Sequence, residues 1–335
     1  MNDAELARKR VTFPCRFVTL TRMSQPLVND AEPSDSLFRE AVSAIDAGDV
    51  AALERLLAAH PELLRDRLVA PGAWLRNKVE GALDGFFKQP YLLWFVAEDP
   101  VRNGKLPRNI AQVARTIIEA ARRQGVDNLQ EQIDYALRLV CWSWIARECG
   151  VQIELVDLLL DAGASVNGSA LNEGRFGTNC DAAIYNRNFA AAERLLERGA
   201  TMTLTTALCL GRWADVERMA KSATLNDKQD AFVQAALNGN AEALRRMLAL
   251  GAEPTTVSAR NQSHGTALHH AVWSRSLDAV KVLVEAGADL NRRDTIYDGT
   301  PLGWAEYAER EQKDASRASE YRAIAEYLEG KGGKR

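Results

Sequence analysis

The sequence predicts an all-α protein built as a helical solenoid, and two repeated features lead to this prediction. The segment GTALHHAVWSRSLDAVKVLVEAGADLN ends at Asn291, and a second opening of the same kind, DGTPLGWAEYA, begins at Asp298. A Gly-Ala pair also closes an apolar helical pattern four times, at Gly163, Gly199, Gly251 and Gly287. A unit of about 33 residues cannot bury its apolar face alone, so such units must stack on one another.

Composition agrees with a water-exposed array that has a continuous core. The chain has 335 residues, of which 47% are hydrophobic and 26% are charged, with a net charge of -3. This charge offers no basic field for nucleic acid or an anionic membrane. The longest apolar run, 91–97, is too short to span a bilayer. Five cysteines without a CxxC pair indicate reduced thiols, so we expect a cytoplasmic monomer that carries no cofactor.

The N-terminal region divides into two parts. Residues 1–33 lack the apolar core of a signal peptide, and we expect them to form a disordered extension. Met23 would make a natural start, which suggests the hypothesis that residues 1–22 come from an upstream start codon. Residues 34–64 are expected to form a divergent first repeat, with a turn at 47–49 and His60-Pro61-Glu62 in place of Gly-Ala.

Residues 65–131 do not follow the repeat frame, and we interpret them as an insertion packed on the repeat stack. Apolar residues from Ile110 to Ala121 recur at helical spacing and predict a helix. The insertion would cap the stack through its aromatic side chains or would project as a recognition element. The aromatic group comprises Trp74, Phe86, Phe87, Tyr91, Trp94 and Phe95.

Residues 132–329 are expected to contain the regular repeats and a C-terminal cap. An inter-helix turn lies twelve residues before each closing Gly, at Arg187, Gly239 and Arg275. A further turn at Gly211 divides the long interval between Gly199 and Gly251, which leaves a shortened unit over 204–222. Arginine at a turn position that favours glycine predicts backbone strain. Residues 330–335 are expected to form a flexible tail.

These motifs resemble ankyrin repeats. GTPL from Gly299, GTALHHA from Gly265 and VLVEAGADLN from Val282 are similar to the two signatures of that family in order and spacing. The resemblance is closest over 264–309, and the whole chain resembles a group of bacterial ankyrin-repeat proteins without an assigned activity. It implies a stack of six or seven repeats, in which His269 bonds one repeat to the next. Gly303, Asp181 and Val233 stand where other copies would carry this His, so only His269 is expected to complete that bond.

Catalytic and metal-binding chemistry finds little support in the sequence, so we expect no catalytic or metal-ligating residue. His264, His269 and His270 lie close together, but neighbouring helical positions point about 100° apart and no Cys or Glu cluster completes a metal site. Cys141 and Cys149 lack the neighbours that activate a nucleophile. An enzyme remains an alternative, with a site in the 65–131 insertion around Glu80, Asp84, Glu98, Asp99 and Arg102.

A protein-binding surface is better supported. When the repeats are aligned by their inter-helix turns, large side chains of the first helix of each repeat fall in rows. Tyr185 and Trp273 fall two residues before the turn, with Tyr307 in the matching place of the last copy. Gln234 and His270 fall five residues before the turn, with Trp304 in the matching place of the last copy. In ankyrin-like stacks such positions line the concave face, where partners dock. The same rings could instead fill the gaps between helices. The candidate protein-binding residues are Tyr185, Gln234, His270, Trp273, Trp304 and Tyr307, with Arg292 and Arg293 as a charged rim.

The sequence therefore favours a non-catalytic scaffold that binds an unidentified protein through the concave helix face and the loops. A narrower alternative is an inhibitor or immunity-type protein that neutralises one enzyme or toxin. Neither nucleic acid nor a membrane is an expected partner.

Overall fold

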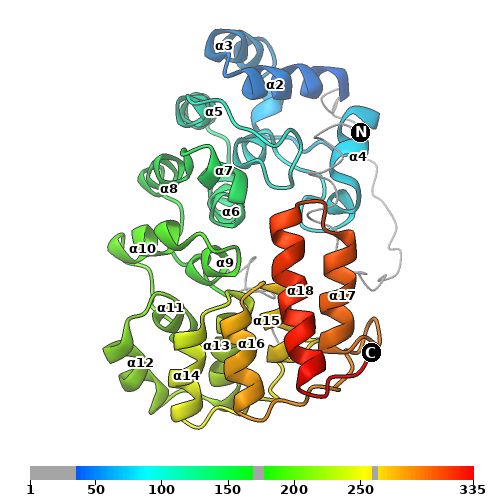
Figure 1. The fold of residues 1–335 in the computed structure, drawn as a ribbon. Coiled ribbons are helices and arrows are strands. Elements are labelled where there is room, and N and C mark those ends of the chain that lie inside the picture. The colour runs from blue at the N-terminus through cyan, green and yellow to red at the C-terminus, as the bar shows by residue number, and fades with distance from the viewer. Residues whose placement is uncertain (1–34, 169–176, 259–262) are drawn as a thin grey trace, which may run out of the picture. The chain divides into compact units, whose positions relative to one another are not determined.

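The computed structural model describes residues 35–168, 177–258 and 263–335, and every regular element in these ranges is helical. This confirms the all-helical prediction for the described part of the chain (Figure 1). The hypotheses for residues 1–33, including the upstream start, concern residues outside these ranges. The chain divides into two compact units, Met1–Asn172 with Glu197–Gly199, and Glu173–Leu196 with Ala200–Arg335.

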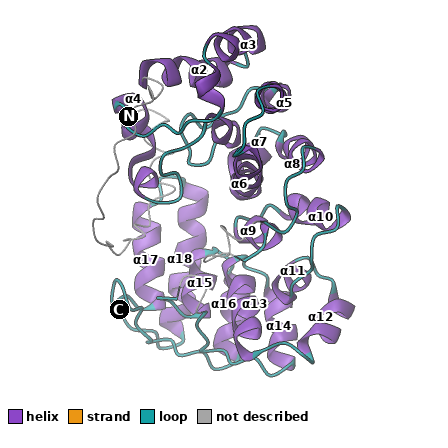
Figure 2. Cartoon of the chain, turned by 180° about the vertical axis from the view of Figure 1, so that it is seen from behind, coloured by secondary structure: helices purple, strands orange, loops and turns teal. Residues whose placement is uncertain are grey.

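The second unit consists of paired helices in two layers (Figure 2). The first helices of the pairs pack in sequence, α9 on α11, α11 on α13, α13 on α15 and α15 on α17, while α14, α16 and α18 pack in the other layer. The helices are α9 (Asn179–Tyr185), α10 (Phe189–Glu197), α11 (Leu204–Cys209), α12 (Trp213–Ala220), α13 (Leu225–Leu237), α14 (Ala241–Ala249), α15 (Ala267–Trp273), α16 (Leu277–Glu285), α17 (Pro301–Glu311) and α18 (Ala315–Gly330).

Local signals in the sequence explain where these helices begin and end. Thr178, Thr203 and Thr224 cap α9, α11 and α13, because each hydroxyl accepts a backbone N–H of the first turn. The closing glycines take the left-handed conformation, as predicted, with φ of 85° at Gly251 and 89° at Gly287. The shortened unit is real, since α11 and α12 form a helix pair within 204–222.

Two inter-helix turns keep the left-handed conformation although their residues are arginines. Arg187 has φ 59° and Arg275 has φ 66°. A left-handed non-glycine residue costs about 1 kcal/mol. These turns therefore retain the strain that the sequence predicts instead of relaxing it.

The described part of the first unit begins with a helix pair over the segment that was expected to form a divergent repeat. Helix α2 (Asp35–Ala47) turns at Gly48 into α3 (Val50–Ala59), which ends at His60. The remaining elements are η1 (Pro61–Leu64), α4 (Ala73–Val79), η2 (Glu80–Asp84), η3 (Leu92–Ala97), α5 (Ile110–Arg123), α6 (Leu129–Trp142), α7 (Trp144–Glu148) and α8 (Gln152–Asp161).

Part of the 65–131 segment occupies the position of a repeat. The 3₁₀ stretch η3 packs against α2 on one side and α6 on the other, and α5 packs against α3 and α8. These are the places that a first and a second helix would take between the α2–α3 pair and the α6–α8 pair. The segment that lacks the repeat motif is thus integrated into the stack of the first unit and is more than an appendage to it.

The η3 segment lacks the amphipathic pattern of a repeat helix, and it is stabilised by burial of all its residues. All six of its residues are buried, and Phe95 is fully shielded from solvent. The Phe95 ring lies 5.2 Å from Phe87 and 5.9 Å from Phe38, measured between centroids. Offset and edge contacts of this kind stabilise aromatic cores. The predicted aromatic group therefore forms a core that joins η3 to α2, although Phe86 points outward and is 44% exposed.

The C-terminal tail is held by hydrogen bonds, in contrast to the flexible tail expected from its composition. The Thr300 hydroxyl donates to the Lys334 carbonyl at 2.6 Å, and the Lys334 amide donates to Asn291 Oδ1 at 2.7 Å. Arg335 forms an ion pair with Glu306 at 2.7 Å. The glycines of the tail allow it to fold back onto Thr300, Asn291 and Glu306. Composition alone could not indicate these contacts.

Candidate functional site

The two rows of first-helix residues differ sharply in exposure. We call the positions two residues before each turn the near-turn row, and those five residues before it the mid-helix row. Tyr307 and Trp304 take the matching places in the last copy, where α17 continues to Glu311. The mid-helix row is buried in all five copies, at Ala182, Thr206, Gln234, His270 and Trp304. The near-turn row is open only at its C-terminal end, where Trp273 is 39% and Tyr307 is 50% exposed. Cys209 in this row is buried, while Tyr185 and Leu237 are half-buried.

Burial corrects three of the eight candidate contacts. Gln234, His270 and Trp304 lie in the interior and pack between helices, which was the alternative role for these side chains. A hydrophobic pattern at helical spacing cannot distinguish a lining residue from a packed one, because both lie on the same side of an isolated helix. Trp273 and Tyr307 are the accessible aromatic residues of the rows.

The buried Trp304 connects the two exposed rings. Its ring centroid lies 6.4 Å from that of Trp273, in a perpendicular arrangement, and Trp304 and Tyr307 are one turn apart on α17. Arg310 lies over the Tyr307 ring at 5.5 Å. The Trp273 carbonyl accepts a hydrogen bond from the Tyr321 hydroxyl of α18 at 3.3 Å. Packing against Trp304 and Tyr321 thus orients Trp273, while large parts of the Trp273 and Tyr307 rings stay exposed.

Asp294 organises the loop that adjoins Trp304, a role that the sequence did not reveal. Its carboxylate accepts the Trp304 indole N–H at 2.9 Å and the backbone N–H groups of Ile296, Tyr297 and Gly299 at 2.7–2.9 Å. Burial opposes ionisation of Asp294, but these hydrogen bonds outweigh it and lower its pKa below the ordinary value. The turn pattern of 294–299 could have suggested this bonding. The loop displays Ile296, which is 61% exposed, and Tyr297, which is 42% exposed.

The two candidate rim arginines have different surroundings. Both Arg292 and Arg293 are exposed. Arg293 is engaged within the molecule, because it donates to the Asp298 carbonyl and to the Arg335 carbonyl, the latter at 3.1 Å. Arg292 is thus the more available of the two for an external contact.

His269 links adjacent repeats as the resemblance implied. The Thr266 amide donates to His269 Nδ1 at 3.2 Å, so this nitrogen is the acceptor and Nε2 carries the proton. Nε2 then donates to the Gly299 carbonyl of the next repeat at 3.1 Å. Burial lowers the pKa of His269, which favours this neutral form.

Asp181 corrects the expectation that only His269 makes such a link. Its Oδ2 accepts the Thr178 amide at 3.0 Å, while Oδ1 accepts the Thr203 hydroxyl of the next repeat at 2.7 Å. A carboxylate has enough acceptor sites to cap its own helix and reach its neighbour. Asp181 therefore also makes a hydrogen bond to the next repeat, although it accepts from a hydroxyl where His269 donates to a carbonyl.

Buried thiols do not provide a reactive centre. Burial raises the pKa of Cys141 and of Cys209 to about 12, so both remain protonated at neutral pH. Among the residues that the structure describes, no group of three His, Cys, Asp or Glu side chains is arranged to hold a metal ion.

The residues of the alternative enzyme site do not assemble into one cleft. Glu98 and Arg102 form a buried ion pair at 3.2 Å, and Glu98 Oε1 also accepts the amides of Arg102 at 3.0 Å and Gly104 at 2.7 Å. Arg102 extends to Asp46 of α2 at 2.9 Å. Glu80 and Asp84 are exposed. Both side chains of the ion pair are buried, so this cluster joins a loop to α2 and keeps the Glu98 carboxylate away from solvent. Apart from its ion pair with Arg102, Glu98 Oε2 accepts no hydrogen bond from the residues that the structure describes.

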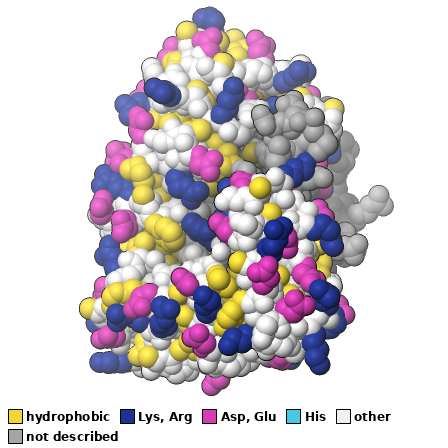
Figure 3. Space-filling model, viewed as in Figure 1, with side chains coloured by type: hydrophobic (Ala, Val, Ile, Leu, Met, Phe, Trp, Pro, Cys, Tyr) yellow, Lys and Arg dark blue, Asp and Glu magenta, His cyan; other side chains and the backbone are white. Residues whose placement is uncertain are grey.

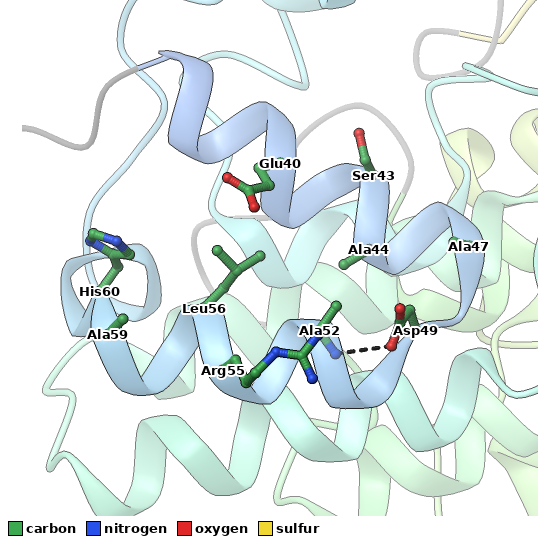
Figure 4. Close-up of a pocket in the computed structure, with 10 residues that line it drawn as sticks. All are labelled: Glu40, Ser43, Ala44, Ala47, Asp49, Ala52, Arg55, Leu56, Ala59 and His60. Atoms are coloured by element: carbon green, nitrogen blue, oxygen red, sulfur yellow. Dashed lines mark hydrogen bonds between the residues drawn. The ribbon is translucent and has the colours of Figure 1, made fainter.

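A shallow groove of about 500 Å³ lies between α2 and α3 (Figure 4). Five of its ten lining residues are apolar, four of them alanines, and two of its five polar residues serve local structure. Asp49 Oδ1 accepts the Ala52 amide at 2.9 Å, and His60 Nδ1 lies 3.2 Å from Glu62. Its lining comprises Glu40, Ser43, Ala44, Ala47, Asp49, Ala52, Arg55, Leu56, Ala59 and His60.

The surface carries both signs of charge in close mixture. On the face in Figure 3, side chains of Lys and Arg alternate with those of Asp and Glu, and hydrophobic groups lie between them. Within the described ranges, no helix is both long and apolar enough to cross a membrane.

A comparison with known protein families agrees with the repeat architecture over 206–294. Residues 206–294 match the family model described as "Ankyrin repeats (3 copies)". The crystal structure of the human ASB11 ankyrin repeat domain is similar at 20% sequence identity, covering 67% of this chain and 96% of that one, with a TM-score of 0.35. No curated protein matches the chain. The fold is thus of the ankyrin-repeat type, and ankyrin repeats generally serve as protein-interaction modules.

Proposed function

We propose that this protein is a non-catalytic scaffold that binds another protein through the exposed end of the near-turn row and the adjoining loop. The single observation that carries this proposal is the exposure of Trp273, which packs on the buried Trp304, and of Tyr307, which follows Trp304 by one turn of α17. Rigid aromatic side chains with a polar atom are the residues that dominate protein interfaces. Ile296 and Tyr297 would extend the contact along the loop.

Only part of the first-helix layer has side chains that are open to a partner. The mid-helix row is packed, and the near-turn row is covered at Cys209. We therefore propose binding at α15, α17 and the 292–297 loop and not along the whole concave face. A scaffold of this kind or an inhibitor of one enzyme would use the same surface, and the identity of the partner would distinguish them.

Affinity capture tests the surface. Full-length wild type and the Trp273→Ala/Tyr307→Ala double variant are immobilised at equal amounts and incubated with lysate of the native cells. The captured proteins are then quantified by mass spectrometry. We expect a captured protein to fall by about tenfold or more in the variant, as for loss of interface hot spots. The matched control is Phe189→Ala/Leu250→Ala, which removes side chains of similar exposure, 37% and 39%, elsewhere on the second unit. Equal capture by all three proteins, with circular dichroism showing intact folds, would refute the proposal.

A further inference from the structure

Three arginines lie near Tyr321, which packs beside the exposed Trp273. Tyr321, whose ring centroid is 6.4 Å from that of Trp273, is influenced by the charges of Arg275, Arg187 and Arg317 and by one carboxylate, Glu320. These side chains come from two inter-helix turns and from α18. Three arginines, two of them paired with the carboxylates Glu320 and Asp314, thus lie near the tyrosine that packs beside an exposed indole.

Arg187 reaches this place from far away in the sequence. Its guanidinium donates to the Leu237 carbonyl at 2.9 Å and to the Ser274 carbonyl at 3.4 Å, at the C-terminal ends of α13 and α15. Cations are favoured at helix C-termini, where the carbonyls of the last turn point outward. The α9–α10 turn is therefore brought close to the end of α15, directly beside Trp273.

The other two arginines form ion pairs that an incoming carboxylate could replace. Arg275 lies 3.3 Å from Glu320, and Arg317 lies 3.7 Å from Asp314. The side chains of both acids are 46% exposed. Exposed pairs of this kind contribute only about 0–1 kcal/mol, so exchanging one carboxylate for another costs little.

We propose that Trp273, Arg187, Arg275 and Arg317 form a site for an acidic protein segment that carries an aromatic or aliphatic side chain. The apolar side chain would pack on the Trp273 indole, and carboxylates next to it would pair with Arg275 and Arg317. This inference rests on the proposed protein-binding function and specifies the chemistry of the partner. Arginine and tryptophan together are the composition found at interface hot spots.

A nucleic acid fits this site less well than a protein segment. Its regularly spaced phosphates would meet Glu320 and Asp314 as well as the arginines. The chain as a whole carries a net charge of -3, which would repel a long polyanion. A short acidic segment can place its carboxylates selectively.

Selection from a phage-displayed library of random peptides tests the inference. Peptides are selected on the full-length protein, and those that no longer bind Trp273→Ala are sequenced and synthesised. We expect them to carry a net negative charge next to an apolar residue. Their affinity should fall by about tenfold in Arg275→Glu, as expected for reversal of an interface charge, and should be retained in Arg275→Lys. The control Arg245→Glu changes an arginine of α14 that is 58% exposed and should leave binding unchanged.

The outcomes separate this inference from the proposed function. Trp273-dependent peptides that are neutral or basic would overturn the acidic site while leaving a protein-binding surface at Trp273. If no selected peptide depends on Trp273 or Tyr307, the proposed surface fails as well. Binding of a single-stranded DNA oligonucleotide that is lost in Arg275→Glu would assign the arginines to nucleic acid and overturn the inference.

Discussion

The pairs η3–α5 and α15–α16 occupy equivalent places in their stacks but are built by different means. In α15–α16, amphipathic helices begin at a capping residue and bury small and aliphatic side chains. In η3–α5, the first element is a 3₁₀ stretch that is buried on all sides and contains Trp94 and Phe95. The comparison shows that a stack requires layers that bury their faces, and the repeat motif is one of several ways to supply them.

The polar groups of the two pairs also differ. His269 links α15 to the next repeat through neutral hydrogen bonds. The loop that joins η3 to α5 is held instead by the buried charges of Glu98 and Arg102. A buried ion pair stabilises only when every polar group around it is satisfied, so this region should be more sensitive to single substitutions.

The largest effect is expected at Phe95. Phe95→Ala should lower the free energy of unfolding by about 3–5 kcal/mol, because it removes a fully buried ring and leaves a cavity. Urea unfolding followed by circular dichroism measures the loss, and hydrogen exchange should show reduced protection in α2 and α6, which η3 contacts. Phe86→Ala, at a 44% exposed position in the same segment, is the control. Loss of protection limited to η3 would show that η3 is an appendage and not a layer of the stack.

Next in size is the buried ion pair. Glu98→Gln should lower the free energy of unfolding by about 3 kcal/mol, at the low end for a broken buried pair, because Arg102 keeps its contact with Asp46. Thermal unfolding compares it with Asp84→Asn, an exposed acid nearby that should have no effect. Similar melting temperatures for both variants would contradict the higher sensitivity to substitution that is expected for this region.

Asp99 should make the stability of the first unit depend on pH. Burial raises the pKa of Asp99 from 3.8 to about 8, and the adjacent Glu98 carboxylate adds to the shift. The nearby Tyr135, with a pKa raised by burial to about 12, stays neutral in this range. The folded state therefore keeps a proton that the unfolded chain releases, and the contribution of Asp99 to stability falls as pH rises from about 4 to about 8.

The variant Asp99→Asn removes this dependence. It should be more stable than wild type at about pH 8, and the difference should vanish towards pH 4. Urea unfolding midpoints across this range measure it. A constant difference at all pH values would mean that Asp99 ionises normally in the folded protein.

The smallest effects concern the two left-handed arginines of the second unit. Arg275→Gly should stabilise the protein by about 1 kcal/mol, because glycine relieves the strain at φ 66° and only an exposed ion pair is lost. Arg187→Gly relieves the same strain but loses hydrogen bonds to two carbonyls, each worth about 1 kcal/mol, and should not stabilise. If the melting temperatures of Arg187→Gly and Arg275→Gly rise equally, the hydrogen bonds of the Arg187 side chain do not contribute to stability.

Prediction from the sequence succeeded where local signals suffice. The left-handed turns at Arg187 and Arg275, the short α11–α12 pair and the His269 link follow from spacing within one or two repeats. The candidate site was only partly predictable. Helical spacing placed His270 and Trp273 in neighbouring rows, but their burial depends on what α17 and α18 bring against them.

By itself, the sequence determined the helical repeats, their turns and their caps, because these depend on interactions between residues close together in the chain. Tertiary structure alone decided that η3 fills a repeat position, that Asp181 replaces a histidine link, and that Arg187 lies beside Trp273. Each of these contacts joins residues that are remote in sequence or unlike the motif. Their energies come from burial and from charge geometry, and neither exists until the layers are packed.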